Sequence, residues 1–227
     1  MRKMITVKIN GEERQYPQGA TYEDVANDYQ QEYENLIALA ARDGKIRELF
    51  KKLTRDCEVT FFTLKDDVGN KTYVRSATML FLKAVFDVYG REAARSCRVE
   101  FAIGNGSYIS PKGKINATEE NAAKIRNRMR ELVEAKTPFL KRSYSLDNAM
   151  ELFRKEGMKD KEKLFRYRRG SFVNIYEMDG YYDYYYGYML PNAGYVKWFD
   201  VIAYEDGFML LLPDKKDPTP VSYTHLR

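Results

Sequence analysis

Histidine is almost absent from this 227-residue chain, whose one histidine, His225, stands two residues before the end. Histidine is the usual general base near neutral pH and the commonest metal ligand. The body of the chain therefore contains neither a Ser-His-Asp nor a Cys-His site, nor the usual zinc sites that mix histidine with cysteine. The two cysteines, Cys57 and Cys97, form no C-x-x-C pair. They predict a reduced, cytoplasmic protein without disulfides.

Three further signals are missing. No apolar run approaches the roughly 18 residues of a membrane-spanning helix, and the chain starts as a strand rather than as a signal peptide, so we expect no membrane partner. No G-x-x-x-x-G-K-[ST] is present, because the nearest fragments, at Gly44 and Gly113, lack the upstream glycine and the hydroxyl residue. The chain thus shows no kinase or NTPase site of its own. The glycines of Gly104-Asn105-Gly106 open no helix and indicate a tight bend.

Charge is present in near balance. The chain has 38 lysines and arginines against 33 aspartates and glutamates, a net charge of +5. This excess permits a polyanion partner such as RNA, ATP or a phosphorylated metabolite without demanding one. Apolar residues make up 44% of the chain, which is enough for a substantial core in an ordinary globular protein.

Residues 1–65 have the pattern of a small domain of strands around one helix. Residues 5–9 alternate apolar and polar, Asn10-Gly11 is a strong hairpin signal, and residues 13–16 return as a second strand. Thr21 is the N-cap of a helix with Asp24 at its third position. Further strands are predicted over 36–41 and 57–61. This ββαββ order predicts a β-grasp fold.

A polar turn over 65–70 is the predicted boundary to a second domain, residues 71–214. Its strongest helices are predicted from Arg75 to Tyr89, ended by Gly90, and from Glu119 to Lys136, capped by Thr118. A third helix is predicted between Ser145 and Gly157. Strands are predicted over 99–103, over 139–144 and from residue 172 onward, with a hairpin turn at 205–207. The second domain is therefore predicted to be α+β.

Six tyrosines between residues 181 and 188 form the densest aromatic cluster of the chain: Tyr181, Tyr182, Tyr184, Tyr185, Tyr186 and Tyr188. One interpretation is a platform on which nucleic-acid bases stack. The favoured interpretation is a strand and turn with one aromatic face buried and the other at a protein contact. The basic run Arg166, Arg168 and Arg169 just before it is an ordinary charged surface or an anion-facing edge.

The span from Met4 to Pro213 resembles the first two domains of threonyl-tRNA synthetase. The residues that carry the first part of this resemblance are the Asn10-Gly11 turn, the helix start at 20–26 and the turn at 42–45. The resemblance implies an α+β protein in which a β-grasp (TGS) domain, 1–65, precedes a domain like the editing domain of threonyl- and alanyl-tRNA synthetases, 71–214.

Every metal-ligand position of that family is replaced here. The family's His-x-x-x-His falls on Arg75 and Met79, and its Cys-x-x-x-His, before a Pro-Asn, falls on Tyr185 and Met189. Arginine cannot bind zinc, and methionine and tyrosine are poor zinc ligands. The resemblance therefore implies no metal and no catalytic residue. It marks these four residues as candidates for binding a small anionic ligand or a nucleotide, with Arg75 holding the anionic group.

A further resemblance concerns a longer protein. Residues 44–49, 57–59 and 208–214 resemble bacterial nucleoside kinases of the uridine kinase and phosphoribulokinase type, in which a P-loop domain follows these two domains. It implies a non-catalytic N-terminal part truncated before that kinase domain. The kinase domain would be its partner and would use ATP and Mg²⁺, with no cofactor on this chain. Residues 221–227 resemble translated sequencing adapter, so a non-native tail is expected after Pro220.

Three functions are therefore open. The first and preferred one is the regulatory or ligand-binding part of an ATP-dependent nucleoside kinase. The second is an RNA-binding or tRNA-binding module derived from a synthetase editing domain, without hydrolase activity. The third is a structural dimerisation module that uses the tyrosine segment.

Overall fold

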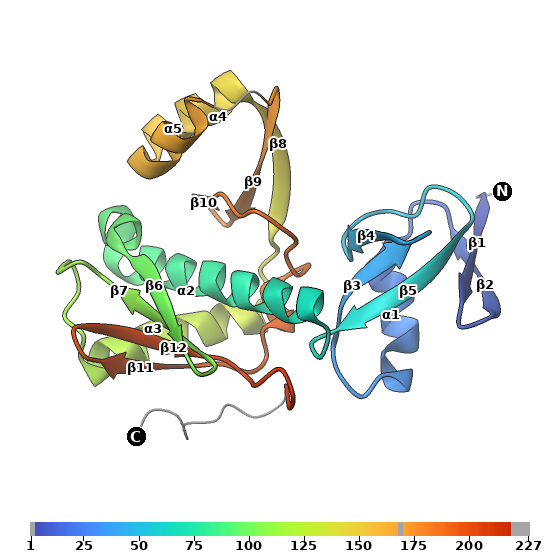
Figure 1. Cartoon of the computed structure of the whole chain (residues 1–227), viewed down its shortest axis with the longest axis horizontal. Coiled ribbons are helices and arrows are strands. Elements are labelled where there is room, and N and C mark those ends of the chain that lie inside the picture. Colours follow the sequence, from blue (N-terminus) through green and yellow to red (C-terminus); the bar gives the residue numbers. More distant parts are fainter. Residues whose placement is uncertain (1–2, 168–169, 219–227) are drawn as a thin grey trace.

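The computed structural model describes residues 3–167 and 170–218. The expected tail over 221–227 and two arginines of the basic run, Arg168 and Arg169, lie outside the described residues. The elements form three sheets with helices packed against them (Figure 1). This arrangement confirms the predicted α+β class. No helix within the described part of the chain is long and apolar enough to cross a membrane.

The first sheet has five strands in the order β2-β1-β5-β3-β4. Strand β1 runs parallel to β5, and the other pairs are antiparallel, which is a β-grasp arrangement. The Thr21 cap is confirmed, because its hydroxyl accepts from the Asp24 N–H and Asp24 accepts in return. The elements are β1 (Met4–Ile9), β2 (Glu12–Pro17), α1 (Tyr22–Tyr29), η1 (Gln30–Glu32), β3 (Ile37–Arg42), β4 (Lys45–Glu48) and β5 (Cys57–Thr63).

The long helix α2 (Asp67–Ser96) follows β5 almost directly. Its start corrects the prediction of a polar turn over 65–70. A Cβ atom at Gly69 would lie 1.9 Å from the Thr63 carbonyl oxygen, so glycine here allows the helix to begin against the end of β5. Gly90 has φ 85° and ψ 174°. The predicted helix break at Gly90 is thus confirmed, although helix resumes beyond it.

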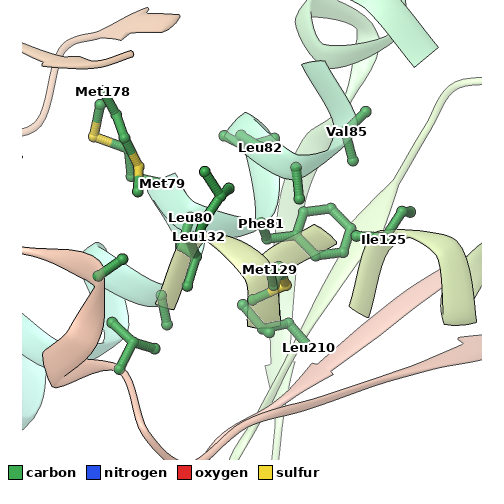
Figure 2. Close-up of a cluster of buried hydrophobic side chains, with 14 of the residues drawn as sticks. Met79, Leu80, Phe81, Leu82, Val85, Ile125, Met129, Leu132, Met178 and Leu210 are labelled. Carbon is green, nitrogen blue, oxygen red and sulfur yellow. The ribbon is translucent and has the colours of Figure 1, made fainter. Parts of the chain in front are cut away.

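A four-stranded antiparallel sheet, in the order β11-β12-β7-β6, packs with α2 and α3 around the largest core of the molecule. Leu80 and Phe81 of α2, Ile125 and Met129 of α3, and Leu210 of β12 meet there (Figure 2). The elements are β6 (Arg98–Ile103), β7 (Gly106–Ser110), α3 (Glu119–Glu134), η2 (Ala193–Tyr195), β11 (Asp200–Tyr204) and β12 (Gly207–Leu211).

The third sheet, β10-β9-β8, stands between the α4–α5 pair and the β-grasp unit (Figure 1). Alternate residues of its central strand point to opposite faces. Val173 and Ile175 pack into the cluster formed with α4 and α5, so Phe172, Asn174 and Tyr176 belong to the other face. The elements are β8 (Leu140–Ser145), α4 (Leu146–Lys155), α5 (Lys159–Phe165), β9 (Phe172–Met178) and β10 (Tyr181–Asp183).

Candidate functional site

The four positions that match the metal ligands of the resembled family lie on α2 and on the segment after β10. Arg75 and Met79 are one helical turn apart, and Met79 is fully buried in the core cluster that also contains Met178 (Figure 2). Met189 is fully buried as well. The candidate ligand residues therefore do not form one open pocket, and only Arg75 and Tyr185 retain partial exposure.

The segment 188–190 is held along α2 by side chains of the helix. Arg75 donates from Nε to the Tyr188 carbonyl oxygen at 3.0 Å, and from a terminal nitrogen to the Thr72 hydroxyl at 3.2 Å. Ser76 accepts from the Leu190 N–H at 3.0 Å, and its hydroxyl lies 3.9 Å from the Met189 sulfur. The structure thus brings Arg75 to the Met189 segment, with its guanidinium bonded inside the protein.

Glu48, at the end of β4, enters this region from the β-grasp unit. Its carboxylate is only 2% exposed and accepts from Lys141 Nζ at 3.0 Å, from the Met189 N–H at 3.3 Å and from the Tyr176 hydroxyl. The Gly187 carbonyl oxygen lies 3.0 Å from the same hydroxyl, so the two acceptors share its single hydrogen. Burial and the Glu48 charge raise the pKa of Tyr176 far above its usual range, so its hydroxyl stays a donor.

Zinc does not fit this position. Arg75 offers no lone pair, the sulfurs of Met79 and Met189 are enclosed in the core, and neither side chain is a usual zinc ligand. Across residues 3–167 and 170–218, no group of three or more histidine, cysteine, aspartate or glutamate side chains could hold a metal ion. The residues present therefore supply no metal-activated water for hydrolysis.

Tyr185 faces an open cleft of about 260 Å³. Its hydroxyl is buried and makes no hydrogen bond with any described residue. A buried hydroxyl is normally bonded, so this unbonded one is a local cost to stability. The cleft is lined by parts of α2, β6, α5 and β10, among them Thr78, Leu82, Arg98, Lys161 and Asp183.

Charges of both signs line this cleft. Arg95 lies 4.8 Å from the Tyr181 ring and donates to the Tyr182 carbonyl oxygen at 2.7 Å. Lys161 is 3.9 Å from Asp183, whose pKa is raised by burial. Together with the exposed Arg98, the described residues of the lining supply three cations against two carboxylates, the second being that of Asp160. The balance suits a ligand with an anionic group.

Cys97 also lines the cleft, but burial raises the pKa of its thiol to about 12. At neutral pH the sulfur is therefore protonated and a poor nucleophile.

The tyrosine run divides between core and surface, as the favoured interpretation predicts for its buried part. Tyr181 is 1% exposed and Tyr186 is 88% exposed. Only Tyr181 and Tyr182 belong to a strand, and the others lie in the segment that leads to Met189. Arg166, which ends α5, is exposed and 4.0 Å from Glu162.

Sequence reasoning missed Glu48, Tyr176 and Lys141. These residues lie far apart along the chain, and no local motif connects them. The one available signal was a carboxylate directly before Leu49 and Phe50, inside the predicted first domain. The pattern does not reveal that this carboxylate points into a second domain.

Comparisons with known proteins support the synthetase resemblance. The chain is similar to the threonine–tRNA ligase of Thermotoga neapolitana, with 28% identity over 208 residues that cover 88% of this chain and 31% of the ligase. The Thermotoga maritima ligase matches at 28% over 207 residues, covering 88% and 30%. The Porphyromonas gingivalis ligase matches at 25% over 194 residues, covering 83% and 29%. No protein-family model matches the chain.

The chain spans less than a third of the length of these relatives. The preferred expectation of a nucleoside-kinase parent is wrong, because the relatives found are threonine–tRNA ligases. With it, the basis for expecting a kinase partner domain, ATP and Mg²⁺ is lost. The second expectation, a module related to tRNA synthetases, agrees with these relatives.

Proposed function

We propose that this chain is an RNA-binding module, with tRNA as its partner class, that lacks hydrolase activity. Its similarity to threonine–tRNA ligases over 88% of its length carries this proposal. The positions that match metal ligands in the resembled family are Arg75, Met79, Tyr185 and Met189, and none of them supplies zinc chemistry. Retained fold and missing catalyst together favour binding without cleavage. A tRNA partner would place the protein in the cytoplasm, as its cysteine usage suggests.

The Tyr185 cleft is the proposed contact for an anionic part of the RNA. Arg98 and Lys161 at its edge would contact phosphate oxygens, which are recognised by cationic side chains without regard to sequence. Arg75, proposed from the sequence to hold the anion, keeps two of its nitrogens on internal partners and would contribute less.

A salt titration of tRNA binding tests the proposal. Unfractionated tRNA should be retained on filters with the protein at low salt, and log K should fall linearly with log salt concentration. Arg98→Ala should weaken binding and reduce the slope by about 1, because one phosphate contact is lost. Lys8→Ala, an exposed cation of β1 outside the cleft, is the matched control and should change little.

The lost chemistry is tested in the same preparation. Aminoacylated tRNA incubated with the protein should keep its amino acid at the rate seen without protein. Failure to retain tRNA at low salt would remove the proposal. Release of the amino acid at a rate that depends on protein concentration would contradict the proposed lack of hydrolase activity.

A further inference from the structure

A hollow of about 350 Å³ lies on the face of the β8–β9–β10 sheet opposite α4 and α5. It is a different space from the Tyr185 cleft, although Tyr184 and Tyr185 contribute to both. Its lining is mainly aromatic: Phe172 and Tyr186 are exposed, and Tyr188, Asn174 and Lys141 complete it along the two strands and the crossing segment.

The exposure of the aromatic rings sets this hollow apart. Tyr186 is 88% exposed and Phe172 is 66% exposed, so two large apolar rings flank one concave space without being covered. Burying such rings against a flat ligand is favourable, because each recovers apolar area and stacking contact. Gly187, which follows Tyr186, has φ 127° and lets the chain turn tightly over the Arg75 guanidinium.

The polar groups of the hollow decide between a phosphate and a flat neutral ring. Among the described residues that line the hollow, Lys141 is the one cation, and its ammonium is bonded to the buried Glu48 carboxylate. The described part of the lining therefore leaves no unpaired cation to take a phosphate. Asn174 is exposed and lines the hollow, so its amide can reach a ligand there. A side-chain amide has an NH₂ donor beside a carbonyl oxygen acceptor, and the edge of a nucleobase presents a matching acceptor and donor.

We infer that this hollow binds one unpaired nucleobase of the RNA, stacked on Tyr186 and Phe172, with Asn174 bonded to its edge. The inference rests on the proposed function and adds a second, base-binding subsite beside the anion-binding cleft. The base must come from a single strand, because bases inside a duplex cannot be stacked on protein rings. The inference also gives a function to the exposed part of the tyrosine run, which does not contribute to the core.

Binding of a fluorescently labelled, single-stranded RNA decamer of mixed sequence, followed by anisotropy at low salt, tests the subsite. Tyr186→Ala should lower the affinity about tenfold, the effect expected when one stacking contact is lost. Tyr186→Phe should bind like the wild-type protein, because the ring rather than the hydroxyl stacks. Asn174→Ala should bind more weakly, and a duplex of the same sequence should bind more weakly than the single strand.

Tyr167→Ala is the matched control, because Tyr167 is 84% exposed and does not line the hollow. It should leave the affinity unchanged. Equal losses in Tyr167→Ala and Tyr186→Ala, or wild-type affinity in Tyr186→Ala, would overturn the subsite while tRNA retention in the salt titration still stood. Failure of the wild-type protein to bind either RNA would overturn both proposals.

Discussion

Tyr176 and Tyr185 are two tyrosines whose hydroxyls have opposite situations. The Tyr176 hydroxyl bonds to Glu48 and to the Gly187 carbonyl oxygen, whereas the Tyr185 hydroxyl is buried without a partner among the described residues. A bonded buried hydroxyl contributes to stability, and an unbonded one costs free energy because it has lost water. Removing the hydroxyl at the two sites should therefore change the free energy of unfolding in opposite directions.

Tyr185→Phe should raise the free energy of unfolding by about 1 kcal/mol, and Tyr176→Phe should lower it by about 1–3 kcal/mol. Urea denaturation of the two variants, each compared with the wild-type protein, measures the difference. Each variant is the matched control of the other, since both remove a single oxygen atom. A loss of stability in Tyr185→Phe would show that its hydroxyl has an internal partner and would contradict the predicted sign.

At the scale of elements, Gly69 allows helix α2 to begin close against the end of strand β5. Alanine there would gain about 1 kcal/mol of helix propensity in α2. Its Cβ would, however, lie 1.9 Å from the Thr63 oxygen and 2.8 Å from the Thr63 carbon, both backbone atoms that cannot rotate away. Overlap with fixed backbone costs about 1–3 kcal/mol or more. We therefore expect the clash to exceed the propensity gain.

Gly69→Ala should accordingly lower the thermal midpoint, and Lys71→Ala, an exposed position in the same helical turn, should leave it within about 2 °C. Differential scanning calorimetry of both variants checks this. A midpoint at or above that of the wild-type protein in Gly69→Ala would contradict the close approach of α2 to β5.

Elements with local signals were predictable from the sequence. The Thr21 and Thr118 caps and the break at Gly90 depend on one or two neighbouring residues, and the structure has all three. Strands β4 and β7 were missed, because Lys45–Glu48 and Gly106–Ser110 contain small or polar residues that form strands only when partners align beside them. Helix α5 was missed because Met158, at its N-cap position, makes no side-chain cap bond.

The candidate site was predictable only in part for the same reason. The resemblance to the synthetase family was enough to single out Arg75, Met79, Tyr185 and Met189. Their surroundings could not be predicted, because the partner of the Met189 N–H is Glu48, 141 residues earlier. The closure of the metal position by internal bonds is a property of tertiary contacts, which no single segment encodes.

Across the whole molecule, Glu48 connects the β-grasp unit to the second unit at the position where the resembled family has its metal. Its three donors all come from the second unit, while Ala38 and Leu39 of β3 join the core cluster around α2. The two units therefore share both an apolar and a polar interface. We expect one cooperative unfolding transition for the wild-type protein, because neither unit can lose its partner without exposing part of a common core.

Glu48→Ala should lower the free energy of unfolding by about 3–5 kcal/mol, because it leaves Lys141, with 17% side-chain exposure, without its charge partner. Glu58→Ala, an exposed carboxylate of β5, is the matched control and should change stability by less than about 0.5 kcal/mol.

A double-mutant cycle with Lys141→Met separates the Glu48–Lys141 pair from the rest of the network. If Glu48 and Lys141 act together, the coupling should be about 0.5–3 kcal/mol in urea denaturation. Additive losses would mean that the tyrosine and the backbone N–H, rather than the lysine, hold the carboxylate in place. A loss of stability no larger than that of Glu58→Ala would mean that the apolar contacts alone keep the units together.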